Sequence, residues 1–134
     1  MAEDADDMAG DASPDRVFTL EEANAMIAGL AEELARIRTA RQVVLRGGKP
    51  IRDSAIGNGG GERGKEYWEA LHALRAGVEA ITREGVVLRD PETGLVDFPS
   101  RREGADVYLC WRLGEDRVNF WHPQDTGFGG RQPL

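Results

Sequence analysis

The chain of 134 residues is poor in the features that mark secreted and membrane proteins. Its one cysteine, Cys110, excludes a disulfide bond within the chain, so the fold has to be held by its hydrophobic core. No stretch approaches the roughly eighteen apolar residues of a membrane span. The first residues (MAEDADDMAGDAS) lack the basic start and apolar segment of a secretory signal peptide. We therefore expect a cytoplasmic protein with no membrane contact.

The sequence also lacks a surplus of positive charge. The formal net charge is −7, and residues 1–16 contribute six acidic residues against Arg16 alone. Because this segment has few large apolar side chains, we predict a disordered acidic leader over residues 1–16, with an acidic interaction arm as the alternative. Nucleic-acid binding depends on basic side chains that meet the phosphates, so the composition argues against nucleic acid as a partner.

Two segments have the three-and-four spacing of apolar residues that is typical of amphipathic helices. We predict a first helix over about residues 19–46, opened by a capping box of Thr19 and Glu22, and a second over about residues 65–84. Between them, seven glycines among eighteen residues predict a flexible loop over residues 47–64. A phosphate-binding loop is the weaker interpretation, because the pattern G-x-x-x-x-G-K-[ST] is absent.

The apolar stripe of the first helix does not specify what it packs against. It contains Leu20, Ile27, Leu30, Leu34 and Ile37. A heptad-like seam can pair with the second helix of the same chain or with a second copy. We expect a homodimer formed through the long helices.

After Gly85 the apolar spacing changes from 3.6 to 2, which is typical of strands. Turn residues separate four predicted strands, at residues 86–89, 95–98, 106–113 and 117–122. The predicted fold is therefore α+β, with a long two-helix antiparallel hairpin packed on a four-stranded antiparallel β-meander. It forms one domain over residues 17–134, with the sheet over residues 86–122 and a tail over residues 123–134.

The register of the last two strands decides which side chains share a face. Centring the turn on Glu115 and Asp116 pairs Trp111 with Phe120. The same register pairs Leu109 with His122 and gathers the apolar side chains on the face that receives the helices. A shift of one residue would exchange these partners, and the gathering of apolar side chains favours the first register.

The end of the sheet that carries His122 is the candidate site. Six residues are candidate ligands for a small anion or a metal ion: His122, Asp97, Asp106, Trp121, Arg101 and Arg131. His122 is the candidate metal ligand or general base, oriented by Asp97 or Asp106. Arg131, in the glycine-rich tail, is suited to clamp a carboxylate or phosphate. The alternative is structural, with these groups pairing at the end of the sheet, because no second ligand stands at metal-binding spacing. The sequence identifies no cofactor.

Two other residues are left out of this site. Glu115 lies at a turn, about 20 Å from His122 at roughly 3.3 Å per residue, so the two cannot share an ion within one chain. Cys110 lies in the middle of a strand and is expected to be an inert, packed thiol.

Several segments resemble a known family. FTLEEANAMI near the start, then GLVDFPSR, VYLCWRLGE, WHPQDTGF and GGRQPL, are similar to small prokaryotic proteins of the domain of unknown function 2203 family. The resemblance covers about residues 17–134. It implies no activity and no site residues, because the family is uncharacterised.

Two functions remain open from the sequence. The first is an interaction or scaffold module that self-associates through its helices. The second is a small enzyme or a ligand- or metal-binding protein with its site at the His122 end of the sheet.

Overall fold

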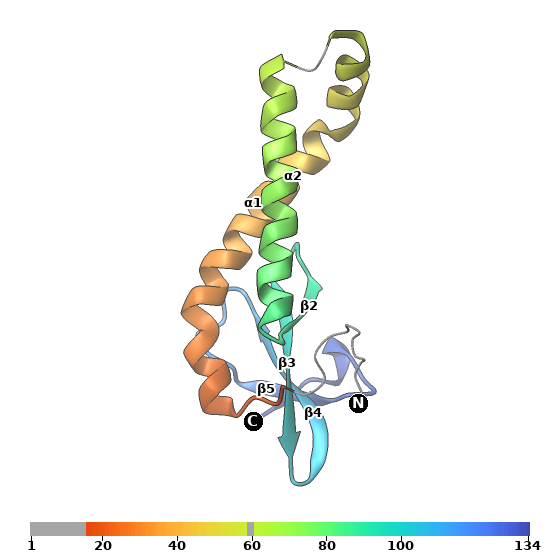
Figure 1. The fold of residues 1–134 in the computed structure, drawn as a ribbon. Coiled ribbons are helices and arrows are strands. Elements are labelled where there is room, and N and C mark those ends of the chain that lie inside the picture. The colour runs from red at the N-terminus through yellow and green to blue at the C-terminus, as the bar shows by residue number, and fades with distance from the viewer. Residues whose placement is uncertain (1–15, 59–60) are drawn as a thin grey trace, which may run out of the picture.

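The computed structural model describes the backbone of residues 16–58 and 61–134, and the side chains of residues 16–47 and 64–134. Helix α1 (Leu20–Asn58) and helix α2 (Gly61–Arg83) form a long antiparallel hairpin, which extends well beyond the sheet (Figure 1). Of the predicted acidic leader, only Arg16 belongs to the described residues. No helix in the described part of the chain is long and apolar enough to cross a membrane.

The start of α1 confirms the predicted capping box. The backbone N–H of Glu22 donates to the Thr19 hydroxyl at 3.0 Å, and the backbone N–H of Thr19 donates to the Glu22 carboxylate at 2.9 Å. These bonds satisfy two backbone donors that have no partner within the helix.

The predicted loop over residues 47–64 differs from the structure, because α1 continues to Asn58 and α2 begins at Gly61. Glycine costs a helix about 1 kcal/mol relative to alanine, which weakens the helix without forbidding it. Proline removes one hydrogen bond and bends a helix that continues past it. Figure 1 shows α1 changing direction in its C-terminal part, where Gly47, Gly48 and Pro50 lie.

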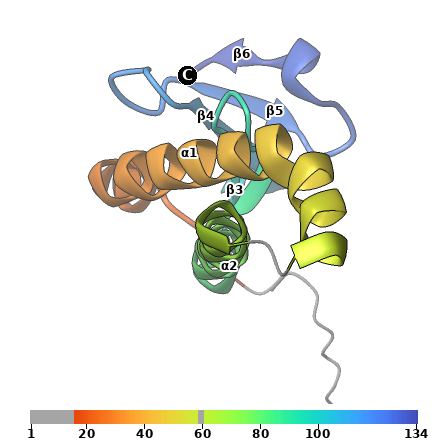
Figure 2. The same ribbon diagram turned by 90° about the horizontal axis from the view of Figure 1, so that it is seen from above.

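The sheet is an antiparallel meander, as predicted, but within the described residues it has five strands in the order β2-β3-β4-β5-β6. The strands are β2 (Val87–Asp90), β3 (Leu95–Arg102), β4 (Ala105–Arg112), β5 (Phe120–Pro123) and β6 (Gln132–Pro133). The fifth strand comes from the predicted tail, which also contains a short 3-10 helix, η1 (Phe128–Gly130). Figure 2 shows both helices on one side of the sheet, with the tail strand β6 beside β5 at the edge farther from them.

The core lies between the helices and the inner face of the sheet. It comprises Phe18, Ala23, Leu30, Leu34, Ile37, Ile81, Val86, Val96, Phe98, Leu109, Trp111 and Val118. Three residues of the predicted helical seam, Leu30, Leu34 and Ile37, are therefore buried within one chain. The period of 3.6 along the helices and of 2 along the strands produces these two apolar surfaces.

The predicted register of β4 and β5 is wrong by one residue. Tyr108 lies opposite His122, and Leu109 lies opposite Trp121. The connection between the strands is longer than the expected two-residue turn. Val118 belongs to this connection and not to a strand, and its backbone N–H donates to the side chain of Asn24 in α1 at 2.7 Å. The turn chemistry of Glu115 and Asp116 therefore did not determine the pairing.

The shift exchanges the two faces of β5. Trp121 packs against the core, where Phe120 was expected. Phe120 lies opposite Cys110 on the outer face, and His122 lies on that face too. Since successive side chains of a strand point to opposite faces, one residue of shift changes the neighbours of every side chain in β5.

Gly94 provides a test of the turn between β2 and β3. Its φ is +75°, and a Cβ atom placed on it would lie 2.6 Å from the Leu113 Cβ. We expect Gly94→Ala to lower the free energy of unfolding by about 2–4 kcal/mol, because it combines a left-handed backbone with a steric overlap.

The matched control is Gly104→Ala, at the turn between β3 and β4. Gly104 has a φ of +82°, but a Cβ atom there would meet nothing within 4 Å. Gly104→Ala should lower the free energy of unfolding only by the cost of the left-handed backbone, about 1–2 kcal/mol. Urea unfolding measures both variants, and equal losses would contradict the role of Leu113.

Candidate metal centre on the outer face of the sheet

Three side chains from neighbouring strands meet on the outer face of the sheet. Asp97 on β3 lies directly opposite Cys110 on β4, and His122 on β5 lies opposite Tyr108. Asp97, Cys110 and His122 are buried, with exposed fractions of 2%, 1% and 1%. Their potential ligand atoms all lie within 4.8 Å of one another. Side-chain alternation along the strands therefore gathers a carboxylate, a thiol and an imidazole in one place.

The hydrogen bonds of His122 determine where its ring proton lies. Nδ1 is 2.8 Å from the backbone oxygen of Pro123, which can only accept, so Nδ1 carries a hydrogen and donates. Nε2 is 3.1 Å from each of the two carboxylate oxygens of Asp97. In a neutral ring with hydrogen on Nδ1, Nε2 has a lone pair that faces the lone pairs of the carboxylate. A proton or another cation has to lie between these two acceptors.

The Asp97 carboxylate is fixed by Arg89. The Arg89 Nε donates to Asp97 Oδ2 at 2.8 Å, and the guanidinium carbon lies 4.9 Å from the centre of the Tyr108 ring. Burial acts to lower the pKa of Arg89, but the hydrogen bond and the charge of Asp97 outweigh it and raise the pKa. Asp97 is therefore an oriented anion between a cation and the imidazole.

Cys110 is a protonated thiol in this environment. Burial raises the pKa of Cys110 to about 11, the Asp97 carboxylate adds to the rise, and Arg131 opposes it. A thiol with this pKa is a weak nucleophile at neutral pH, because the thiolate is the reactive form. The proximity of Cys110 to His122 therefore does not indicate a cysteine hydrolase.

Arg131 lies beside the site, and its charge is paired with a glutamate. Its Nη2 donates to both carboxylate oxygens of Glu115 at 2.7 and 2.9 Å, and its guanidinium also acts to lower the pKa of the neighbouring Cys110. The guanidinium also lies over the rings of Phe120 and Phe128, at 4.0 and 4.6 Å from the ring centres. The tail folds back over the outer face, which brings Arg131 to the turn between β4 and β5.

The remaining candidates lie apart from His122. Arg101 and Asp106 are opposite one another on β3 and β4, and their exposed side chains form an ion pair at 3.1 Å. Arg101 is four residues from Asp97 along β3, or roughly 13 Å at about 3.3 Å per residue. Trp121 packs against the core and under Arg102, whose guanidinium lies 4.8 Å from the centre of the indole.

Of the six predicted residues, the structure brings together His122 and Asp97, and it places the Arg131 guanidinium beside Cys110 of the same cluster. Cys110 and Arg89 also belong to the site, and sequence reasoning left them out. The pairing of β3 with β4 was the signal that would have placed Cys110, because it sets Cys110 opposite Asp97.

A cavity of about 300 Å³ borders the site. Asp97 and Cys110 line it, together with Arg89, Leu95 and the loop of residues 124–128. The buried residues are therefore next to a space that a small molecule can occupy.

Comparison with known proteins gives a family but no activity. Residues 16–134 match the family described as "Uncharacterized conserved protein (DUF2203)". The chain belongs to this family. The match confirms the resemblance seen in the sequence, and the family description assigns no function. No curated protein and no solved structure matches the chain.

The Glu115–Arg131 ion pair makes stability depend on pH. Burial acts to raise the pKa of Glu115, but hydrogen bonds from Arg131 and the backbone of Arg112 outweigh it, so the pKa lies below its ordinary value. A carboxyl with a depressed pKa stabilises the fold above its unfolded-state pKa, and this contribution is lost as the pH falls through the folded-state pKa. We expect Glu115→Gln to lower the free energy of unfolding at pH 7 by about 1–2 kcal/mol, since the pair is only partly buried.

The difference between wild type and Glu115→Gln should shrink as the pH falls below about 4.3, because the unfolded-state glutamate becomes protonated there before the folded-state one does. Urea unfolding between pH 3 and pH 7 measures it. The control is Glu69→Gln, because the contact of Glu69 with Lys65 is 3.9 Å and both side chains are about two-thirds exposed. A pH-independent difference for Glu115→Gln would contradict the assignment.

Proposed function

We propose that this protein binds a divalent transition-metal ion through Asp97, Cys110 and His122. The observation that carries the proposal is the position of His122 Nε2, which lies 3.1 Å from each carboxylate oxygen of Asp97 while Nδ1 is bonded to the Pro123 carbonyl. An ion between these groups replaces two opposed acceptors with two metal bonds. The Cys110 sulfur would supply a third bond from the same side of the sheet, with its thiol proton released to solvent as the ion binds.

The donor set favours zinc. Zinc takes nitrogen, sulfur and oxygen ligands together, whereas magnesium and calcium prefer oxygen alone. A tetrahedral zinc ion with bonds of about 2.0 Å to nitrogen and oxygen holds those atoms roughly 3.3 Å apart, close to the separation of Nε2 from Asp97. The bond from His122 Nδ1 to the Pro123 carbonyl is the arrangement by which proteins orient a metal-binding histidine.

Three protein ligands support a site with an open position. Structural zinc sites use four protein ligands, while catalytic sites use three and leave the fourth for water or substrate. The cavity beside Asp97 and Cys110 lies where such a position would open. The small-enzyme or ligand-binding interpretation is therefore the better supported of the two functions, with the ion as a Lewis acid or ligand anchor.

Metal binding is tested with purified full-length protein stripped by a chelator. We expect one zinc or cobalt ion per chain, and a sulfur-to-cobalt charge-transfer band in the cobalt form. Cys110→Ser should abolish that band, and His122→Gln should weaken metal affinity at least tenfold, because each removes a ligand. Isothermal titration and absorption spectra measure these effects.

The control variant is Ser100→Ala, another buried polar residue on β3, whose hydroxyl donates to the Phe18 backbone oxygen at 2.6 Å. It should lower stability without changing the metal stoichiometry or the spectrum. If the wild type takes up neither ion at micromolar concentration, a proton and not a metal lies between His122 and Asp97, and the proposal is wrong.

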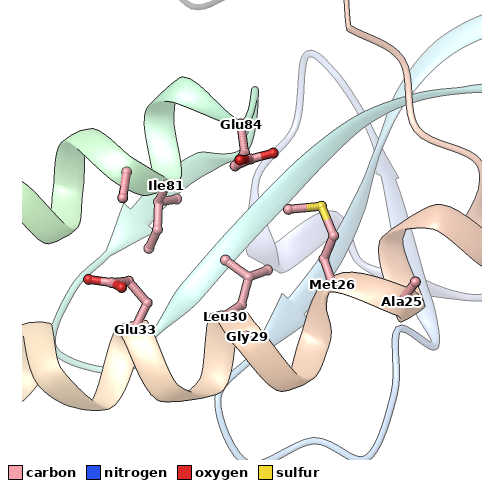
Figure 3. Close-up of a pocket in the computed structure, with 8 residues that line it drawn as sticks. Ala25, Met26, Gly29, Leu30, Glu33, Ile81 and Glu84 are labelled. Carbon is pink, nitrogen blue, oxygen red and sulfur yellow. The ribbon is translucent and has the colours of Figure 1, made fainter.

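We propose as a second function that the chain self-associates as a homodimer and acts as an interaction scaffold. The supporting observation is the exposure of Leu45 and Trp68, at 63% and 57%, in the C-terminal half of α1 and the N-terminal half of α2. Single-chain packing already uses most of the predicted helical seam. What remains there is a groove of about 380 Å³, with Met26, Leu30 and Ile81 between Glu33 and Glu84 (Figure 3).

A dimer through the end of the hairpin predicts a specific effect of Trp68→Ser. Removing this side chain should weaken dimerisation at least tenfold, because a buried tryptophan contributes roughly 2 kcal/mol or more to an interface. Analytical ultracentrifugation across a concentration series measures the effect. Val17→Ser is the control, since Val17 is also exposed, at 46%, but lies at the opposite end of the molecule. A monomer at all concentrations would exclude self-association.

A further inference from the structure

The cavity at the proposed metal centre has a distinct chemical lining. Two of the three proposed ligands, Asp97 and Cys110, form part of its wall. His122 lies beneath them, with an exposed fraction of 1%. An ion held by these three residues would therefore present its open position to the cavity and not to bulk solvent.

The cavity has one cationic side chain among its lining residues, that of Arg89. Its Nε is used by Asp97, but a guanidinium has five N–H donors, and the side chain is 42% exposed. Two other lining side chains use a donor within the protein. The Gln124 amide donates to the Val107 backbone oxygen, and the Thr126 hydroxyl donates to that of Pro123. Arg89 is thus the group placed to bind an anion beside the ion.

The remaining walls determine the size and polarity of the ligand. Leu95 and Phe128 supply apolar surface. A space of about 300 Å³ lies at the lower end of the range of ligand pockets, so it is suited to a small molecule. Asp125 also lines the cavity, and its negative charge disfavours a second anionic group on the ligand.

We propose that the site binds a small monocarboxylic acid with a short apolar tail, a proposal that rests on the metal centre proposed above. One carboxylate oxygen takes the open position on the ion, and the other accepts a hydrogen bond from Arg89. The tail lies against Leu95 and Phe128. In this arrangement the charged part of the ligand meets the ion and Arg89, and its apolar part meets the apolar side chains.

The test uses the cobalt-loaded full-length protein and four probes: acetate, butyrate, inorganic phosphate and butylamine. Each is titrated while the visible spectrum and the thermal midpoint are recorded. Butyrate should change the cobalt spectrum and bind roughly tenfold more tightly than acetate, because two more methylene groups are buried. Phosphate, which carries a second charge, and butylamine, which is cationic, should bind more weakly than butyrate.

Phe128→Ala tests the contribution of the ligand's apolar tail separately from that of its carboxylate. It should weaken butyrate binding about fivefold or more while acetate binding and the metal stoichiometry stay the same. The matched control is Trp68→Ala, which removes an exposed aromatic side chain from the helical hairpin and should alter none of these values.

The outcomes distinguish this proposal from the one on which it rests. If cobalt binds but no carboxylate changes the spectrum or the thermal midpoint at millimolar concentration, the ligand class is wrong and the metal centre stands. If phosphate or butylamine binds more tightly than butyrate, the ligand class is also wrong. If cobalt does not bind at all, both proposals are wrong.

Discussion

The pairing of β4 with β5 is the constraint on which the outer face of the sheet depends. Tyr108 opposite His122 places the imidazole on the same side as Asp97 and Cys110. A shift of one residue would turn His122 toward Leu109 and the apolar core, where no carboxylate is available to it. The site therefore exists only in this register, and the long connection before β5, tied to α1 through Val118, keeps the register in place.

The topology also covers the two faces of the sheet with different segments, the helices on the inner face and the tail on the outer face. The helices bury the inner face with apolar side chains, as hydrophobic periodicity requires. The outer face is covered by the tail, which contributes the Phe128 ring and Arg131, and which adds the edge strand β6 to the sheet. Buried polar groups under this cover need partners, because an unpaired one costs about 1–3 kcal/mol. Arg89, Asp97 and His122 meet this need among themselves and with the backbone of Pro123.

Much of the fold could be predicted from the sequence, because local patterns determine it. The capping box at Thr19, the stripe through Leu34 and Ile37, and the positive φ of Gly94 all follow from residue types a few positions apart. The loop over residues 47–64 was predicted incorrectly because glycine and proline weaken a helix without setting where it ends. Cys110 and Arg89 were left out of the site, and the pairing of Arg131 with Glu115 was not foreseen, because these positions depend on strand register and on the path of the tail. Both are contacts between distant residues, and they carry no signal in local spacing.

The tail strand also bears on how the sheet meets other chains. Unpaired strand edges are templates for aggregation, since their free N–H and C=O groups can pair with a strand of another molecule. Among the described strands, β6 forms one edge, with only two residues, one of which is Pro133, an amino acid without an N–H group. The other edge is β2, four residues long, where the pairing with β3 is irregular between Leu88 and Asp90. Both edges are thus too short and interrupted to add a strand from another copy, which protects the sheet in a chain that has no disulfide bond to stabilise it.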